Sequence, residues 1–412
     1  MKKNLLLMHL ESLNCLNYKM NEDLFPNLKE IEKHCIVFDH YYSTATSTLM
    51  VIGDLLYGGM KIYESCESLD DIPESYCYTS SIFDDLKGQG YNTGIYIYPN
   101  GGDRDGAELR HLAGFENRME LIQKYSDYLD TFRKKMSCAP FALMSCNYIS
   151  NLSLNSYVDI NNYDVNVNNW EAGFRCMDQH CGTLFAFLQE KGLLEHTIVI
   201  FYGDHGDDYW GHGMHKGLTH AIEPNNLLIH TPLFIWDGNL RKKPEHDLRL
   251  VQTSDLREIM FHLLNGAEIE RMPVRRYAIS RNEYAAQPLR IESFNKAYSI
   301  TDGRYFLMVS GNGLNMYDCK MDPSCMNDLL CFFSYENGIL KENERNEEYG
   351  FHFKCYWDSR EQRVLRQKFY ELYRVLYENV LELYIAGGQK ESRMLQEMRF
   401  DRLCANNEKT YD

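Results

Sequence analysis

Residues 197–206 read Thr-Ile-Val-Ile-Phe-Tyr-Gly-Asp-His-Gly. The first six are rich in β-branched and aromatic side chains, which predicts a strand buried on both faces of a sheet. The strand breaks at Gly203, and Asp204 and His205 follow directly. Because open α/β sheets place their ligands at the carboxyl ends of strands, this pair is a candidate functional site. A solvated polar loop is the alternative interpretation.

Predicted strands and helices alternate on either side of this stretch. Such alternation is typical of an α/β domain with a mostly parallel central sheet and helices on both faces. The predicted strands are residues 3–10, 36–38, 93–98, 140–146, 197–202 and 231–236, and the predicted helices include 81–87, 117–136, 170–191 and 254–264.

The pattern changes near residue 295. Residues 296–301 and 304–309 alternate around Asp302-Gly303, as antiparallel strands do. Residues 360–385 form a long amphipathic helix, which packs on the core or pairs with a second subunit as a homo-oligomer. We therefore predict an α/β domain over residues 1–290, followed over 291–412 by a smaller subdomain with an antiparallel sheet, a long helix and a helical tail.

The bulk composition excludes some classes of partner. The 412 residues carry a formal net charge of −16, which disfavours nucleic acid because a phosphate backbone requires a basic surface. No run approaches the roughly 20 apolar residues of a membrane span. The apolar N-terminal stretch is too short for a signal peptide, and the 13 cysteines show no zinc-ribbon spacing. We expect a cytoplasmic protein with reduced thiols.

A hydroxyl-rich loop, residues 41–48, precedes an apolar segment at 49–56. A hydroxyl at a helix N-terminus can serve as a nucleophile, because the free N–H groups there favour anions. An ordinary serine or threonine cap explains the same pattern equally well.

Several segments, in order, resemble sulfatase-like members of the alkaline phosphatase superfamily. They are Leu-Glu-Ser-Leu at 10–13, Tyr-Ser-Thr-Ala at 42–45, Leu-Leu-Tyr-Gly at 55–58, Asp-His-Gly at 204–206, Thr-Pro-Leu at 231–233 and Tyr-Asp at 317–318. The resemblance covers about residues 3–330. It implies the alkaline phosphatase-like fold, with the catalytic domain in residues 1–290.

The resemblance also implies a metal site. Glu11, Asp204 and His205 match the family's protein ligands for a divalent ion, which would be Mn²⁺, Zn²⁺ or Mg²⁺. Counting back from Gly58 places the nucleophile, which is also a ligand, at Thr48, with Thr46 as the alternative.

The departures from the sulfatase pattern bear on the reaction. Sulfatases carry Cys/Ser-x-Pro-x-Arg, which is converted to formylglycine, whereas residues 48–52 here read Thr-Leu-Met-Val-Ile. A threonine nucleophile is similar to that of lipoteichoic acid synthases and phosphoethanolamine transferases. We expect His215 and Lys216 to take part in catalysis. The residues expected to bind substrate are His212, His220, Asn100 and Arg104.

Three functions remain open. The first is a metal-dependent phosphotransferase or phosphodiesterase that acts on a phospho-alcohol, phosphonate or sugar-phosphate ester, as a small molecule or part of a glycan. The second is a sulfate or phosphate monoester hydrolase that works without formylglycine. The third is an inactive binding protein that keeps the fold.

Overall fold

The computed structural model describes most of the chain. The described residues are 2–60, 80–98, 119–121, 125–147, 163–208, 223–238, 245–267, 269, 272, 274–282, 296–310, 313–330, 333–336, 339–342 and 359–398.

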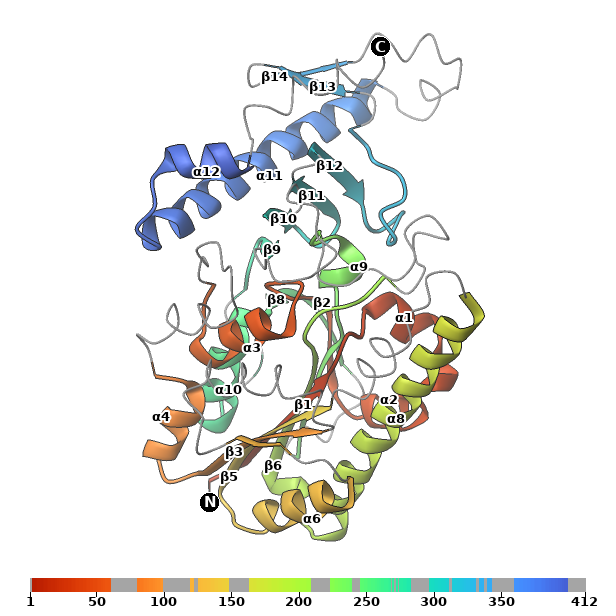
Figure 1. The fold of residues 1–412 in the computed structure, drawn as a ribbon, viewed down its shortest axis with the longest axis vertical. Helices are drawn as coiled ribbons and strands as arrows, with labels where there is room; N and C mark the ends of the chain where they lie inside the picture. Colours follow the sequence, from red (N-terminus) through yellow and green to blue (C-terminus); the bar gives the residue numbers. More distant parts are fainter. Residues whose placement is uncertain are drawn as a thin grey trace.

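Eight strands of the described residues form the central sheet: β1 (Asn4–Leu10), β2 (Ile36–Tyr42), β3 (Asn92–Tyr98), β4 (Met119–Leu121), β5 (Phe141–Asn147), β6 (Thr197–Gly203), β7 (Leu233–Asp237) and β8 (Glu245–Gln252). Their order is β4–β3–β5–β1–β6–β7–β2–β8 (Figure 1). Neighbours run parallel except at β7, which is antiparallel to both β6 and β2. The prediction of a mostly parallel sheet is confirmed.

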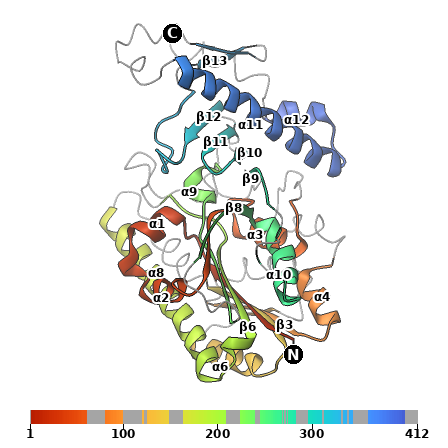
Figure 2. The ribbon, with the colours of Figure 1, turned by 180° about the vertical axis from the view of Figure 1, so that it is seen from behind.

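Successive side chains of β1 point to opposite faces of the sheet, and both faces carry a hydrophobic core. Leu5 and Leu7 pack on the face covered by α3 (Thr48–Tyr57), α4 (Ile82–Gly88) and α10 (Leu256–Leu264). Leu6 and Met8 pack on the other face, whose covering helices are labelled in Figure 2. That face is covered by α1 (Cys15–Met20), α2 (Pro26–Glu32), α6 (Tyr125–Met136) and α8 (Tyr163–Glu190).

A second, antiparallel sheet has the order β12–β11–β10–β9. Its strands are β9 (Ala278–Asn282), β10 (Ala297–Thr301), β11 (Tyr305–Ser310) and β12 (Gly313–Asp318), and a separate pair comprises β13 (Phe333–Glu336) and β14 (Ile339–Glu342). The predicted C-terminal antiparallel sheet is thus confirmed, and β9 belongs to it although it precedes residue 291.

The long predicted helix is α11 (Ser359–Ala386), followed by α12 (Glu391–Met398). Phe369, Leu372 and Leu376 of α11 are fully buried in a core shared with Tyr298 and Leu307 of the second sheet. The apolar stripe that predicted this helix therefore packs within the chain, and its pairing with a second subunit stays a prediction. No helix among the described residues is both long and apolar enough to cross a membrane.

The predicted helix at 117–136 is wrong in its first part. Residues 119–121 form β4, which pairs in parallel with β3 at the edge of the central sheet, and the helix α6 begins only at Tyr125. Three residues are too few to show a strand period, so pairing with β3 decides their conformation.

A buried polar network joins the sheet to two covering helices. The Ser145 hydroxyl of β5 lies 2.9 Å from Nε2 of His180 on α8 and also hydrogen-bonds the hydroxyl of Tyr128 on α6. Burial lowers the pKa of His180 from 6.5 to about 3. The imidazole is therefore neutral in the folded protein at neutral and mildly acidic pH.

This network predicts a pH dependence of stability. Below pH 6.5 His180 is protonated in the unfolded chain, whereas in the folded chain it becomes protonated only near pH 3. The free energy of unfolding should fall with acidification by up to about 1.4 kcal/mol per pH unit from this residue alone. His180→Gln lacks this pH-dependent contribution to the free energy of unfolding. The difference in free energy of unfolding between parent and variant should therefore become smaller from pH 6 to pH 4. Urea unfolding of both proteins across that range measures the gap, and parallel curves would contradict the assignment.

Candidate metal centre

The first two acids of the site meet because two parallel strands end side by side. The register of β1 and β6 pairs Leu10 with Gly203, the last residue of each strand. Glu11 and Asp204 come next in the chain and leave the sheet at the same edge. Ser12 turns the chain there with a φ of 59°, and its N–H donates to Asp204 Oδ1 at 3.1 Å.

Thr48 reaches this edge from β2, because residues 43–47 carry the chain from that strand to α3, which begins at Thr48. Thr48 Oγ1 lies 3.2 and 3.4 Å from the two carboxylate oxygens of Glu11 and 3.1 Å from His205 Nε2. The Thr46 hydroxyl is buried and makes no hydrogen bond within the described residues. Of the two threonines considered as nucleophile, Thr48 is the one in contact with the acid and the imidazole.

His205 presents one particular ring nitrogen to this cluster. Its Nδ1 lies 3.0 Å from the carbonyl oxygen of Gly206. Because a carbonyl only accepts hydrogen bonds, Nδ1 carries the proton, and the lone pair of a neutral ring is then on Nε2. Nε2 lies 3.4 Å from Asp204 Oδ2 and 3.8 Å from Glu11 Oε1. This nitrogen is oriented as a metal ligand would be.

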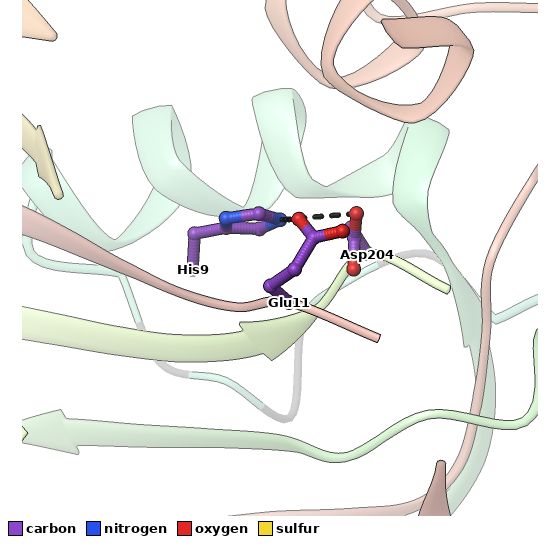
Figure 3. Close-up of side chains that lie close together, drawn as sticks. All are labelled: His9, Glu11 and Asp204. Atoms are coloured by element: carbon purple, nitrogen blue, oxygen red, sulfur yellow. Dashed lines mark ion pairs between the residues drawn. The ribbon is translucent and has the colours of Figure 1, made fainter. Parts of the chain in front are cut away.

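His9 also belongs to the cluster and was not predicted from the sequence. Its Nε2 lies 3.1 Å from Asp204 Oδ2 and 3.3 Å from Glu11 Oε2. Figure 3 shows the three side chains close together, with dashed lines for the ion pairs. His9 stands two residues before Glu11, so the period of a strand places both on one side of the chain. That spacing was the available signal, but the apolar residues around His9 made the stretch look like an ordinary buried strand.

The two carboxylates differ in their affinity for protons. Burial raises the pKa of Glu11 well above its usual value, and the charges of Asp204 and Asp207 raise it further. Burial also acts to raise the pKa of Asp204, but the imidazoles of His205 and His9 outweigh it and lower that pKa below its usual value. The two shifts run in opposite directions, so Glu11 is the carboxylate that takes up a proton more readily, because two neighbouring buried carboxylates repel one another.

The cluster fits a hard divalent cation. Ligand atoms bound to one such ion at about 2.1 Å lie about 3.0–3.4 Å from one another in octahedral or tetrahedral sites. His205 Nε2 lies 3.1 Å from Thr48 Oγ1, 3.4 Å from Asp204 Oδ2 and 3.8 Å from Glu11 Oε1, and Thr48 Oγ1 lies 3.2 Å from Glu11 Oε1. Atoms of His9, Glu11 and Asp204 also lie within 4.8 Å of one another. Carboxylates with an imidazole and an alcohol suit Mn²⁺, Zn²⁺ or Mg²⁺.

Gly206 allows the chain after His205 to pass close to another backbone. Its N–H donates to the Leu228 carbonyl at 2.7 Å, in the short helix α9 (Asn226–Ile229). A β-carbon on Gly206 would lie 2.0 Å from the Leu227 carbonyl oxygen and 2.6 Å from Asn14 Cβ. Only glycine fits here without moving the turn that orients His205.

We therefore expect Gly206→Ala to lower the affinity of the site for a divalent cation by about tenfold or more, as misplaced ligand orientation does. Titration calorimetry with Mn²⁺ measures the change. Gly88→Ala is the matched control, because nothing lies within 4 Å of a β-carbon added there. An unchanged Mn²⁺ affinity in a folded Gly206→Ala protein would contradict the close approach.

The other expected site residues lie outside the part of the chain that the structure describes. The two expected to take part in catalysis, His215 and Lys216, lie outside the described residues. The same holds for the four expected to bind substrate, His212, His220, Asn100 and Arg104.

Comparison with known proteins identifies a sulfatase-like segment. Residues 154–267, which include β6 and the Asp204–His205 pair, match the family model described as Sulfatase. The chain is 29% identical over 192 residues to an arylsulfatase of Clostridium perfringens, an alignment that covers 42% of this chain and 39% of the arylsulfatase. The match thus spans about two fifths of that relative's length.

Solved structures share the fold over most of the chain. A protein solved in complex with its substrate, D-glucosamine-2-N,6-O-disulfate, has a TM-score of 0.60 at 14% identity, covering 95% of this chain and 99% of that one. The lipoteichoic acid synthase LtaP of Listeria monocytogenes has a TM-score of 0.55 at 13% identity, covering 77% and 85%. At these identities the likeness establishes the fold, as the motifs in the sequence predicted.

Proposed function

We propose that this sulfatase-like chain of the alkaline phosphatase superfamily is a metal-dependent phosphotransferase or phosphodiesterase with Thr48 as its nucleophile. The contact of Thr48 Oγ1 with Glu11 Oε1 at 3.2 Å and with His205 Nε2 at 3.1 Å is the observation that carries the proposal. A threonine hydroxyl is a weak nucleophile at neutral pH and needs such neighbours to become reactive.

Glu11, Thr48, Asp204 and His205 would hold the divalent cation, and His9 would add a second imidazole. A cation bound there supplies a lower pKa for the threonine hydroxyl and offsets negative charge on the phosphoryl group. The hydrogen bond from His205 Nδ1 to the Gly206 carbonyl keeps Nε2 unprotonated and directed at Thr48.

The reaction has two steps. Thr48 Oγ1 gives its proton to solvent water and attacks the phosphorus of a phospho-alcohol, phosphonate or sugar-phosphate ester. The new oxygen–phosphorus bond forms as the bond to the leaving alcohol breaks, and the leaving oxygen takes up a proton. An acceptor alcohol or water then attacks the same phosphorus and gives up a proton, while the bond from phosphorus to Thr48 Oγ1 breaks and Thr48 Oγ1 takes up a proton. Among the residues outside the described part, we propose that His215, Lys216 or His220 stabilises the phosphoryl oxygens and protonates the leaving group.

A sulfate or phosphate monoester hydrolase without formylglycine is the second candidate. The similarity to an arylsulfatase favours it. Residues 48–52, Thr-Leu-Met-Val-Ile, disfavour the sulfatase mechanism through formylglycine. They lack the cysteine or serine, the proline and the arginine of Cys/Ser-x-Pro-x-Arg.

The test combines metal analysis with a substrate panel. Purified protein should bind one of Mn²⁺, Zn²⁺ or Mg²⁺, and the loaded protein should cleave bis(p-nitrophenyl) phosphate faster than p-nitrophenyl phosphate or p-nitrophenyl sulfate. A faster reaction with the sulfate would support the second candidate instead. Protein that neither contains nor takes up any of the three metals would be a binding protein that has kept the fold.

A further inference from the structure

We propose that Arg281 is a positioning residue for Thr48, supplied by the second sheet. The proposal rests on the proposed function for the role of Thr48. Arg281 lies on β9 of the second sheet, whereas Glu11 and Asp204 follow strands of the central sheet. Its guanidinium holds the chain on both sides of the nucleophile.

Arg281 makes hydrogen bonds before and after Thr48 in the chain. Its Nη1 and Nη2 donate to the two carboxylate oxygens of Asp54, in the second turn of α3, at 2.6 and 3.0 Å. Nη1 also donates to the Thr44 carbonyl at 3.3 Å, and the backbone N–H of Arg281 donates to the same carbonyl at 3.0 Å. One residue therefore ties the 43–47 segment to the helix that Thr48 begins.

The rest of β9 strengthens this attachment. The Ser280 hydroxyl donates to the Ser43 carbonyl, and Ala45 forms a parallel β-bridge with Arg281. The 43–47 segment thus lies along β9, which in both ribbon views is the strand of the second sheet drawn nearest to α3 (Figures 1 and 2). These contacts attach the 43–47 segment to a strand that is itself hydrogen-bonded into the second sheet.

Stability alone is a weak reason for such a pair. Arg281 and Asp54 are both fully buried. Desolvating two charges offsets much of their attraction, so apolar replacement of both partners is often neutral or stabilising, whereas removal of one is strongly destabilising. The bidentate geometry instead fixes direction and distance, which a nucleophile requires, since a displacement of about 1 Å can cost about a hundredfold in rate.

The double variant Arg281→Met/Asp54→Leu separates positioning from stability, because it leaves no unpaired buried charge. We expect it to fold, to bind Mn²⁺ within about threefold of the parent, and to lose about a hundredfold in kcat on bis(p-nitrophenyl) phosphate with KM little changed. Amide hydrogen exchange at residues 43–50 should be at least about tenfold faster. Arg281→Lys keeps the charge without the bidentate geometry and should recover part of the kcat lost in Arg281→Met.

Lys3→Met/Asp237→Leu is the matched control. Lys3 Nζ lies 2.6 Å from Asp237 Oδ2, and the two side chains are 17% and 8% exposed. Lys3 comes just before β1 and Glu11 just after it, so this ion pair lies at the other end of the strand from the metal centre. The kcat of this control and its exchange at residues 43–50 should match those of the parent. A folded Arg281→Met/Asp54→Leu protein with parental kcat overturns the positioning role, as does a loss of kcat accompanied by an equal loss of Mn²⁺ affinity.

The exchange measurement does not depend on turnover, which separates this inference from the proposed function. An active Thr48→Ala protein would overturn Thr48 as nucleophile, and with it any role of Arg281 in positioning one. Parental exchange at residues 43–50 in the double variant would overturn the attachment itself, even if Thr48 proves to be the nucleophile.

Discussion

Thr48→Ala should lower kcat on a phosphodiester by about a thousandfold or more, the scale on which loss of a nucleophile is felt. The alanine removes the only side-chain oxygen that this position offers to phosphorus. Metal affinity should stay within about tenfold of the parent, because the carboxylates of Glu11 and Asp204 and the imidazoles supply most of the attraction. Stopped-flow kinetics and Mn²⁺ titration of the same preparation give both numbers.

Two neighbouring variants serve as controls for that result. Thr46→Ala removes a buried hydroxyl that makes no hydrogen bond among the described residues, and it should keep parental kcat. Thr48→Ser keeps the attacking oxygen and should keep measurable turnover. If Thr46→Ala were inactive and Thr48→Ala active, the nucleophile would be Thr46.

Glu11→Gln should have opposite effects on metal binding and on stability. Mn²⁺ affinity should fall by about a hundredfold or more, because a neutral amide replaces a charged ligand. Metal-free protein at pH 7 should become more stable by about 1–3 kcal/mol, because the amide needs neither the desolvation of a charge nor the uptake of a proton. Burial and the charges of Asp204 and Asp207 hold the pKa of Glu11 well above its usual value, so the surroundings disfavour the charged form of this side chain.

Denaturant unfolding in the presence of EDTA and of Mn²⁺ tests this reversal. The variant should be the more stable protein in EDTA and the less stable one in saturating Mn²⁺, since the parent gains the larger binding energy. Glu32→Gln is the control, because Glu32 accepts from Tyr18 and pairs with Lys29, away from the cluster. A Glu11→Gln protein with undiminished Mn²⁺ affinity would remove Glu11 from the ligand set.

The sequence could indicate site residues where side chains able to bind a metal directly follow a predicted strand. Asp204 and His205 follow a long β-branched run, so they could be anticipated at the carboxyl end of a strand, whereas Glu11 was expected as a ligand only through the resemblance to the sulfatase-like family. His9 could not be separated from its apolar neighbours, because a buried strand predicts burial and not ligation. Arg281 gave no signal at all, since its partner Asp54 is 227 residues away and belongs to another structural layer.

Predictions of the elements succeeded or failed for a similar reason. The 3.6-residue period of α11 was long enough to be decisive, and its stripe is buried as expected. The three residues of β4 have no period of their own, and only their pairing with β3 makes them a strand. Tertiary contacts that link distant segments thus decide the parts that a local pattern leaves open.

The pairing of β1 with β6 has a consequence for biosynthesis. Ser12 and Asp204 stand 192 residues apart, and the centre does not exist until β6 is inserted between β1 and β7. A nascent chain that has not yet emerged from the ribosome as far as β6 has Glu11 and Thr48 but lacks Asp204 and His205. It also leaves the β1 edge open to wrong partners, the kind of exposure that chaperones cover. We expect the ion to be acquired late, after translation of more than half the chain.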